Sequence, residues 1–235
     1  LKQQNIVLDH CIVGEPSNPS YIGEEIKVGR RGSLLGSLTL HGTQGHIAYP
    51  ERADNPMPRL AAVLDRLCND VLDQGTDIFQ PSNLEVTSVD VGNKAHNMLP
   101  QSIEVKFGIR YNSLHDFDSL EVLLNQKFDD IHDKLGGRYD VKYTRSGEAF
   151  YTKNELLVGL MSNAITKHCG KAPKLSTAGG TSDARFIKNH CPTIEFGLIG
   201  ATMHKIDEHV NVADIETLAN IYHQVIGEYF VGENN

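Results

Sequence analysis

A glutamate held between a glycine and a proline, Gly14-Glu15-Pro16, directly follows a short apolar run at residues 11–13. Gly14 accepts backbone angles that other residues avoid, while Pro16 fixes its own φ and has no N–H to donate. A carboxylate held rigidly at the end of a strand is an oxygen donor suited to a metal site or to acid–base chemistry. A strand-ending turn with a solvated glutamate explains the segment equally well, so Glu15 needs a second signal.

A small-residue loop near the other end of the chain has the composition of a ligand-binding loop. It occupies residues 176–182, contains two glycines, and continues into residues 183–187, whose pattern is typical of a helix. Glycines let backbone N–H groups approach a ligand, and the N-terminus of a helix favours negative charge. The loop therefore indicates a place where an anion is held.

His204 follows the apolar residues 192–200, which have the composition of a strand. A neutral imidazole nitrogen just past a strand is a donor suited to zinc. A single loop histidine is usually an ordinary surface residue. Together with the rigid carboxylate of Glu15, however, His204 predicts a metal centre to which both ends of the chain contribute.

Six segments, taken in chain order, resemble one family of enzymes. They are IVGEPS (12–17), GRRGSL (29–34), HGTQGHIAYPERADNP (41–56), HNMLP (96–100), STAGGTSDARFI (176–187) and MHKIDEHV (203–210). Through them the chain resembles the dizinc aminoacylase/carboxypeptidase family of metallohydrolases over nearly all of its 235 residues. The form of residues 176–187 resembles the branch that hydrolyses succinyl amides. Acetylornithine deacetylases and other acylamino-acid hydrolases of the family stay as the alternative.

The resemblance implies an α/β fold and the hydrolysis of an amide. The expected architecture is a partial zinc-aminopeptidase-like catalytic domain with an inserted ferredoxin-like α+β lid, or dimerisation, domain. Two zinc ions, or cobalt in their place, would share a bridging water, and Glu15 and His204 would be terminal ligands, one on each metal. The implied partners are a small-molecule substrate and a second subunit bound through the lid, with neither nucleic acid nor membrane.

The resemblance also assigns contacts to the substrate. His46 resembles the lid histidine that reaches the neighbouring subunit's site and steadies the oxyanion of the tetrahedral intermediate. Asn97 and Arg110 resemble the family's substrate-binding amide and guanidinium, and the fork of Arg110 suits a carboxylate. Of Arg30 and Arg31, we expect Arg30 to serve the substrate or the hinge to the lid. The residues expected to hold a substrate carboxylate are Gly179, Gly180 and Thr181.

Part of the family's metal site has no counterpart in this sequence. The family supplies a His and an Asp at a strand end, a bridging Asp and a Glu-Glu pair, all before the segment that matches residues 12–17. Only eleven residues precede Ile12, and the one Glu-Glu pair, Glu24-Glu25, lies in the approach to the lid, where we expect solvated surface. We therefore expect the C-terminal part of a longer enzyme, metal-poor and inactive by itself.

Hydrophobic periodicity predicts a separate domain in the middle of the chain. The expected elements are strands at 33–40, 84–91, 103–111 and 139–143, and helices beginning near residues 57 and 117. A change of phase between Val86 and Val89 indicates a bulge. The order β-α-β-β-α-β is that of a ferredoxin-like sheet with two helices on one face.

This middle domain interrupts a second one. We place the lid at 32–145 and the catalytic part at 1–31 and 146–235. The catalytic part carries predicted helices at 153–168 and 212–230, each with an apolar stripe. We therefore expect the lid to be an insertion between two segments of the catalytic part.

Composition excludes several classes of function. The formal net charge of −8 argues against non-specific binding to nucleic acid. No apolar run approaches the roughly 20 residues that cross a bilayer. The four cysteines are scattered without a Cys-x-x-Cys pair, so we expect reduced thiols. These features are typical of a cytoplasmic protein.

Two functions from other classes stay open. One is a dimerisation module in which the ferredoxin-like sheet joins two subunits. The other is a non-catalytic binder that uses the glycine-rich loop and Arg110. The metal-type donors Glu15 and His204 argue against the binder, because a binder has no need of them.

Overall fold

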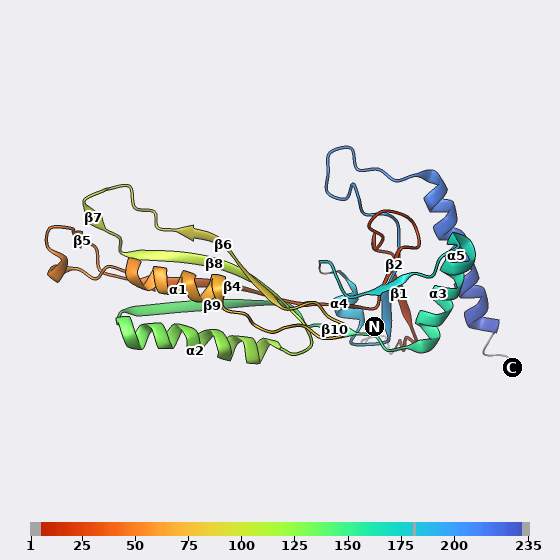
Figure 1. Cartoon of the computed structure of the whole chain (residues 1–235), viewed down its shortest axis with the longest axis horizontal. Coiled ribbons are helices and arrows are strands. Elements are labelled where there is room, and N and C mark those ends of the chain that lie inside the picture. The colour runs from red at the N-terminus through yellow and green to blue at the C-terminus, as the bar shows by residue number, and fades with distance from the viewer. Residues whose placement is uncertain (1–5, 181, 232–235) are drawn as a thin grey trace. The chain divides into compact units, whose positions relative to one another are not determined.

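The computed structural model describes residues 6–180 and 182–231, and the chain divides into two compact units. The terminal unit combines the residues up to Arg31 with those from Phe150 onward, and the middle unit is Gly32–Ala149 (Figure 1). The middle unit is thus inserted into the terminal one. The predicted boundary after residue 145 lies inside the last strand of the middle unit, because that strand continues to Gly147.

The middle unit is built on a four-stranded antiparallel sheet with the strand order β6-β8-β4-β9. Its elements are β4 Gly32–His41, α1 Met57–Asn69, β6 Asn83–Asp90, β8 Ser102–Tyr111, α2 Phe117–Leu135 and β9 Arg138–Gly147. Their succession confirms the predicted β-α-β-β-α-β order. A short 3-10 helix, η2 Pro50–Arg52, and a two-stranded pair of β5 Gly45–His46 with β7 Met98–Leu99 were not predicted.

Alternation along the strands places the core of the middle unit on one face of its sheet. The buried residues of β8 are Ile103, Val105, Phe107, Ile109 and Tyr111. The apolar stripes of α1 and α2 belong to the same hydrophobic cluster, so both helices cover that face. The register of β6 shifts between Val86 and Ser88, which confirms the predicted bulge. α2 begins at a capping box formed by Asp116 and Ser119.

The terminal unit has a mixed sheet with the strand order β1-β12-β2-β11. Its elements are β1 Cys11–Val13, β2 Glu25–Lys27, β3 Gly29–Arg30, β10 Phe150–Tyr151, α3 Glu155–Cys169, β11 Lys174–Ser176, α4 Ala184–Ile187, β12 Thr193–Glu195 and α5 Val212–Val231. The pairs β1–β12 and β2–β11 are parallel, whereas β12 meets β2 antiparallel. Residues of α3 and α5 share one core with the two inner strands, where Ile26 and Ile194 are fully buried.

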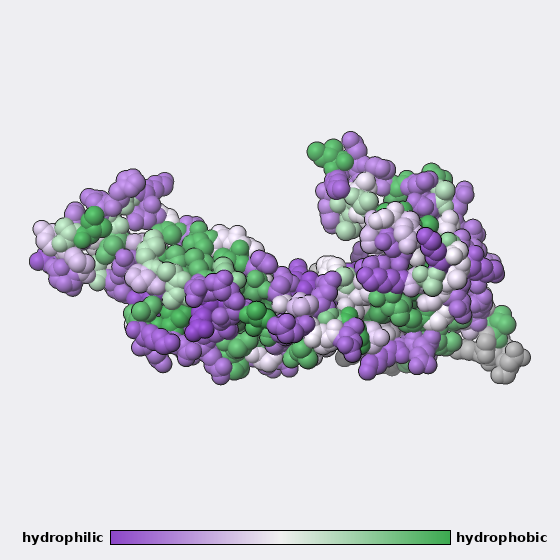
Figure 2. All heavy atoms as spheres, viewed as in Figure 1, coloured by the Kyte–Doolittle hydropathy of each residue, from purple (hydrophilic) through white to green (hydrophobic). Residues whose placement is uncertain are grey.

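Hydrophobic side chains at the surface of each unit are interspersed with hydrophilic ones (Figure 2). Single exposed apolar residues of this kind are normal in folded proteins. Among the described residues, no helix is long and apolar enough to cross a membrane.

Candidate active site in the terminal unit

Two segments from opposite ends of the sequence lie side by side where β1 and β12 end. The N–H of Phe196 donates to the carbonyl of Val13 over 3.1 Å, and the N–H of Gly200 donates to the carbonyl of Asn18 over 2.9 Å. The parallel pairing of β1 with β12 therefore continues beyond both strands. This junction brings the Gly-Glu-Pro segment beside the chain that leads to His204.

Asn18 and Gly197 secure the junction. The Asn18 side chain, 1% exposed, donates from Nδ2 to the carbonyl of Gly197 over 2.6 Å and accepts from the N–H of Glu25 over 3.0 Å. A Cβ at position 197 would collide with the carbonyl oxygen of Glu15, so only glycine allows the two backbones to approach this closely. The place of Glu15 thus depends on residues far along the chain.

A cavity of about 560 Å³ opens beside this junction, within the terminal unit. Glu15 and His204, the two predicted metal ligands, both line it, as do the predicted substrate contacts Arg30, Gly179 and Gly180. The metal-centre hypothesis requires that Glu15 and His204 meet, and the fold brings them to one cavity.

The backbone around the two predicted ligands differs from expectation. His204 is exposed, has a φ of 61° and lies in turns well beyond β12, which ends at Glu195, whereas the sequence suggests a position just past a strand. A positive φ is uncommon for a residue with a side chain. Gly14 does not have a positive φ, so the freedom that glycine allows is not used in that way at this position.

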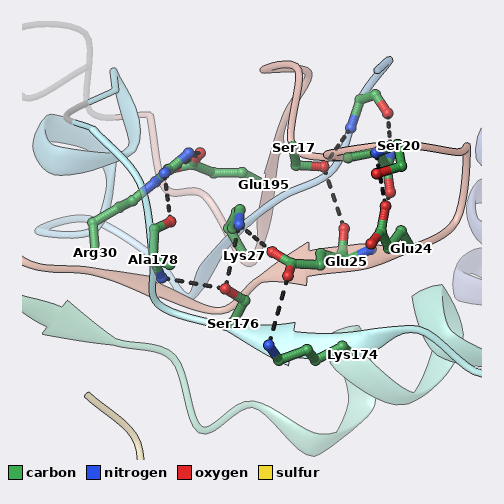
Figure 3. A network of polar contacts seen from close by, with 12 residues as sticks. Ser17, Ser20, Glu24, Glu25, Lys27, Arg30, Lys174, Ser176, Ala178 and Glu195 are labelled. Atoms are coloured by element: carbon green, nitrogen blue, oxygen red, sulfur yellow. Dashed lines mark hydrogen bonds and ion pairs between the residues drawn. The ribbon is translucent and has the colours of Figure 1, made fainter. Parts of the chain in front are cut away.

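Arg30 is held by a carboxylate that sequence reasoning missed. Its Nε donates to both carboxylate oxygens of Glu195, over 3.0 and 3.1 Å, and its Nη2 donates to Oε2. Its Nη1 donates to the carbonyl of Ala178 over 2.9 Å, and the hydroxyl of Ser182 donates to Glu195. Figure 3 shows the Arg30 side chain reaching toward Glu195 and Ala178. Arg30, 8% exposed, thereby ties β3 to β12 and to the glycine-rich loop.

The two described glycines of the loop are under different constraints. Gly179 has a φ of 114°, and a Cβ there would collide with Nη1 of Arg30. Gly180 has no positive φ, and a Cβ there would meet no atom within 4 Å among the described residues beyond its chain neighbours. Packing therefore requires glycine at position 179 only. Thr181, the third predicted carboxylate contact, lies outside the described residues.

A buried ion pair lies beside the same cavity. Lys27 lines the cavity, and its Nζ donates to the carboxylate of Glu25 and, over 3.2 Å, to the hydroxyl of Ser176 (Figure 3). The prediction of solvated surface is wrong for Glu25, because β2 is an inner strand and all three of its residues are buried. Burial acts to raise the pKa of Glu25, but the hydrogen bond and charge of Lys27, together with the Ser176 hydroxyl and the charge of Lys174, keep that pKa below its usual value.

The donor set fits zinc in kind but not in number. A carboxylate oxygen and an imidazole nitrogen are ordinary zinc ligands, and Glu15 and His204 supply them at the cavity. Across residues 6–180 and 182–231, no group of three or more His, Cys, Asp or Glu side chains is arranged to hold a metal ion. Tight zinc sites use three or four protein donors. The described part of this chain therefore does not make a complete metal site.

His46 and Asn97 are neighbours at one end of the middle unit. His46 pairs with Met98 in the short β5–β7 ladder, and the N–H of Ile47 donates to the carbonyl of Asn97 over 3.1 Å. The His46 side chain is exposed, with Nδ1 accepting from the N–H of Ala48 over 3.0 Å. Both predicted contacts thus lie in one exposed loop region beyond the end of β4, where Figure 1 shows β5 and β7 close together.

Arg110 lies at the opposite end of the same sheet. It faces Ser33 across the β4–β8 ladder, near the start of β4, and donates to the hydroxyl of Ser33. The eight residue steps from Ser33 to His41 span about 27 Å of strand. Within one copy of the middle unit, Arg110 is therefore too far from the His46 loop to contact the same small molecule.

Named proteins match this sequence over nearly its whole length. Residues 28–135 match the peptidase dimerisation domain. The chain is 51% identical over 225 residues to the succinyl-diaminopimelate desuccinylase of Rhodospirillum centenum, covering 96% of this chain. It is also 51% identical over 232 residues to that of Parvibaculum lavamentivorans, covering 99%. The chain spans 57% and 59% of the lengths of these two relatives.

Solved structures of lower identity share the fold. Aminopeptidase PepT from Bacillus cereus matches 97% of this chain with a TM-score of 0.81 at 17% identity, and the chain covers 59% of it. The di-peptidase Dug1p from Saccharomyces cerevisiae matches 93% of this chain with a TM-score of 0.68 at 15% identity, again with 59% of its own length covered. The chain thus has the fold of the corresponding part of these peptidases, matches a peptidase dimerisation domain over residues 28–135, and is a homologue of the succinyl-diaminopimelate desuccinylases over the part that it spans.

Proposed function

We propose that this chain serves in a metal-dependent amide hydrolase that removes succinate from N-succinyl-LL-2,6-diaminopimelate, a step of diaminopimelate and lysine biosynthesis in the cytoplasm. The observation that carries the proposal is that Glu15 and His204 line one cavity in a chain 51% identical to named desuccinylases over 96% of its length. Each residue supplies a donor that zinc accepts. The amide would bind in this cavity, next to the metal that the two residues would help to hold.

The remaining cavity residues suit a substrate that carries carboxylates. Arg30 and Lys27 place a guanidinium and an ammonium on the cavity wall, and Gly179 and Gly180 expose backbone there. Such groups bind carboxylate oxygens through charge-assisted hydrogen bonds. Bound zinc or cobalt would supply a water of lowered pKa and polarise the amide carbonyl. Its further ligands and the general base would come from outside the described residues of this chain.

A second subunit completes the proposal. The match of residues 28–135 to a dimerisation domain supports a homodimer formed through the middle unit. His46 and Asn97 lie at the far end of that unit's sheet from Arg110, which supports a role for these two residues in the partner's site. An imidazole N–H directed at the oxyanion would contribute on the order of 3 kcal/mol to the transition state.

A chimera tests this function directly. The chain replaces the matching 59% of the Parvibaculum lavamentivorans desuccinylase, and the purified chimera is assayed with zinc on N-succinyl-LL-2,6-diaminopimelate. We expect turnover, and we expect Glu15→Gln and His204→Ala each to abolish it. His209→Ala, at an exposed histidine that does not line the cavity, is the matched control and should leave turnover unchanged.

The same chimera tests whether N-acetylornithine is the better substrate. N-acetylornithine should be hydrolysed far more slowly than the succinyl substrate. Faster hydrolysis of N-acetylornithine would assign the chain to the acetylornithine deacetylases. A folded dimeric chimera without activity on either substrate would leave dimerisation as the function of this chain.

A further inference from the structure

We propose that Glu195 is a positioning residue that fixes the guanidinium of Arg30 at the cavity and thereby sets the affinity of the terminal unit for a carboxylate. Glu195 does not line the cavity, so it acts through Arg30, which does. The inference rests on the proposed function, in which Arg30 binds a carboxylate of the substrate. It adds Glu195, a residue of β12 that sequence analysis did not single out.

The burial of Glu195 is the first step of the argument. Glu195 is 0% exposed, on a strand flanked by β1 and β2. An ionised carboxylate without partners would be very costly there. It is instead met by Nε and Nη2 of Arg30 and by the hydroxyl of Ser182. These hydrogen bonds hold the carboxylate, and the carboxylate in turn holds Arg30 in one orientation.

The second step of the argument concerns the N–H groups of Arg30 that could bind a carboxylate. A guanidinium has five N–H groups. Glu195 takes the one on Nε and one on Nη2, and the carbonyl of Ala178 takes one on Nη1. Among residues 6–180 and 182–231, one N–H on each terminal nitrogen has no acceptor. Two N–H groups from the two terminal nitrogens form a fork that matches the two oxygens of a carboxylate.

Glu195 could influence carboxylate affinity through its charge or by positioning Arg30. These two explanations predict opposite effects of Glu195→Gln, so an experiment can separate them. Replacing Glu195 by glutamine removes a negative charge next to Arg30 and so makes the surroundings of the cavity more positive. If charge alone set the affinity, a carboxylate would bind more tightly to the variant. If Glu195 positions Arg30, the guanidinium loses its fixed orientation and the carboxylate binds more weakly.

The test titrates succinate into the 235-residue chain and follows it by NMR. We expect Glu195→Gln to raise the dissociation constant by about tenfold or more, as the loss of a charge-assisted contact would. Glu195→Asp keeps the charge and should restore part of the affinity. The Nε–H signal of Arg30 should be slow to exchange with solvent in the wild type and fast in Glu195→Gln. Asp73→Asn, at a half-buried carboxylate of the middle unit, is the control for lost stability alone and should leave the dissociation constant unchanged.

The outcomes separate this inference from the proposed function. If Arg30→Ala weakens succinate binding while Glu195→Gln leaves it unchanged or strengthens it, the positioning role is wrong and the proposed function stands. If Arg30→Ala does not change succinate binding, or if the wild-type chain binds no succinate, both the positioning role of Glu195 and the proposed function are wrong. Ser182→Ala gives a second test if Glu195→Gln fails to fold. It removes one hydrogen bond to Glu195 and should weaken binding about two- to threefold, and no change would contradict the inference.

Discussion

The side-chain amide of Asn18 donates to the carbonyl oxygen of Gly197 over 2.6 Å and so joins residues 179 positions apart. The same side chain accepts from the N–H of Glu25 and is 1% exposed. Both partners are backbone groups in a buried place, where a lost partner is not replaced by water. Asn18 is therefore a buried side chain that links the two cavity segments through backbone groups of both.

Replacing Asn18 with alanine should lower the free energy of unfolding by about 2–4 kcal/mol, because two buried backbone groups lose their partners. Urea unfolding followed by circular dichroism measures the change. Asn163→Ala, at an exposed position of α3, should change stability by less than about 0.5 kcal/mol. Equal losses in the two variants would contradict the role given to Asn18.

Gly179→Ala should destabilise the chain by about 1–3 kcal/mol, because alanine strains a φ of 114° and its Cβ displaces the guanidinium of Arg30. Gly180→Ala is the matched neighbour, since a Cβ at that position meets no atom within 4 Å. Thermal unfolding of the two variants should therefore differ clearly. A Gly180→Ala variant as unstable as Gly179→Ala would show that the loop has another conformation.

The elements of the middle unit are predictable from sequence because their signals are local. Strict alternation from Ile103 to Tyr111 fixes β8, and the phase change near Val86 marks the bulge of β6. The short β5–β7 pair escaped prediction because each strand has only two residues and no periodicity can be seen over that length. Periodicity thus finds long elements and misses the short ladder that holds His46.

Asp73 connects two loops of the middle unit and makes its stability depend on pH. Burial acts to raise the pKa of Asp73, but hydrogen bonds from Ser82, from the N–H of Gly75 and from Asn112 lower it to about 2. His115 adds a contact at 3.1 Å. A carboxyl whose pKa is lower in the folded state stabilises that state when ionised.

The contribution of Asp73 should be complete above its ordinary pKa of 3.8 and should vanish as the pH falls toward about 2. At pH 7 it amounts to about 2 kcal/mol. Urea unfolding between pH 6 and pH 2 should show that Asp73→Asn is less stable than the wild type at high pH and that the two curves converge at low pH. The exposed Asp133→Asn should follow the wild type throughout. Parallel curves for the wild type and Asp73→Asn would exclude this account.

The chain by itself should hold zinc weakly, because Glu15 and His204 are the donors it brings to the cavity and tight sites use three or four. Dialysis against a weak chelator should remove the metal, as measured by elemental analysis. Glu15→Gln and His204→Ala should each weaken the residual binding seen by calorimetry. Retention of two zinc ions per chain after dialysis would contradict this prediction.

His46 should act on the partner's substrate. In the chimera, His46→Ala should lower kcat by about 10²–10³, the usual cost of one oxyanion donor. Mixing subunits that carry Glu15→Gln with subunits that carry His46→Ala should restore activity. Each mixed dimer then has one site with an intact Glu15 and an intact His46 from the other subunit. A mixture as inactive as its components would place His46 in its own subunit's site.

The cavity of the terminal unit was predictable only in part, since its residues meet through long-range pairing. Glu15 and His204 are recognisable by residue type and by the motifs around them. Glu195 and Lys27 are not, because each lies in a buried three-residue strand whose covering neighbours cannot be read from the sequence. An acidic residue within the buried run Thr193–Phe196 was the one available signal that Glu195 needs a cationic partner.

The close approach at Gly197 restricts how this protein can be altered. Because any side chain there would push back the carbonyl of Glu15, substitutions that retune substrate choice must leave position 197 untouched, however far it lies in sequence from the residue it accommodates. Libraries randomised around Glu15 alone would still be limited by the close contact with Gly197, near the opposite end of the polypeptide. Paired variation of both segments is the way to reshape this pocket without losing its acidic donor.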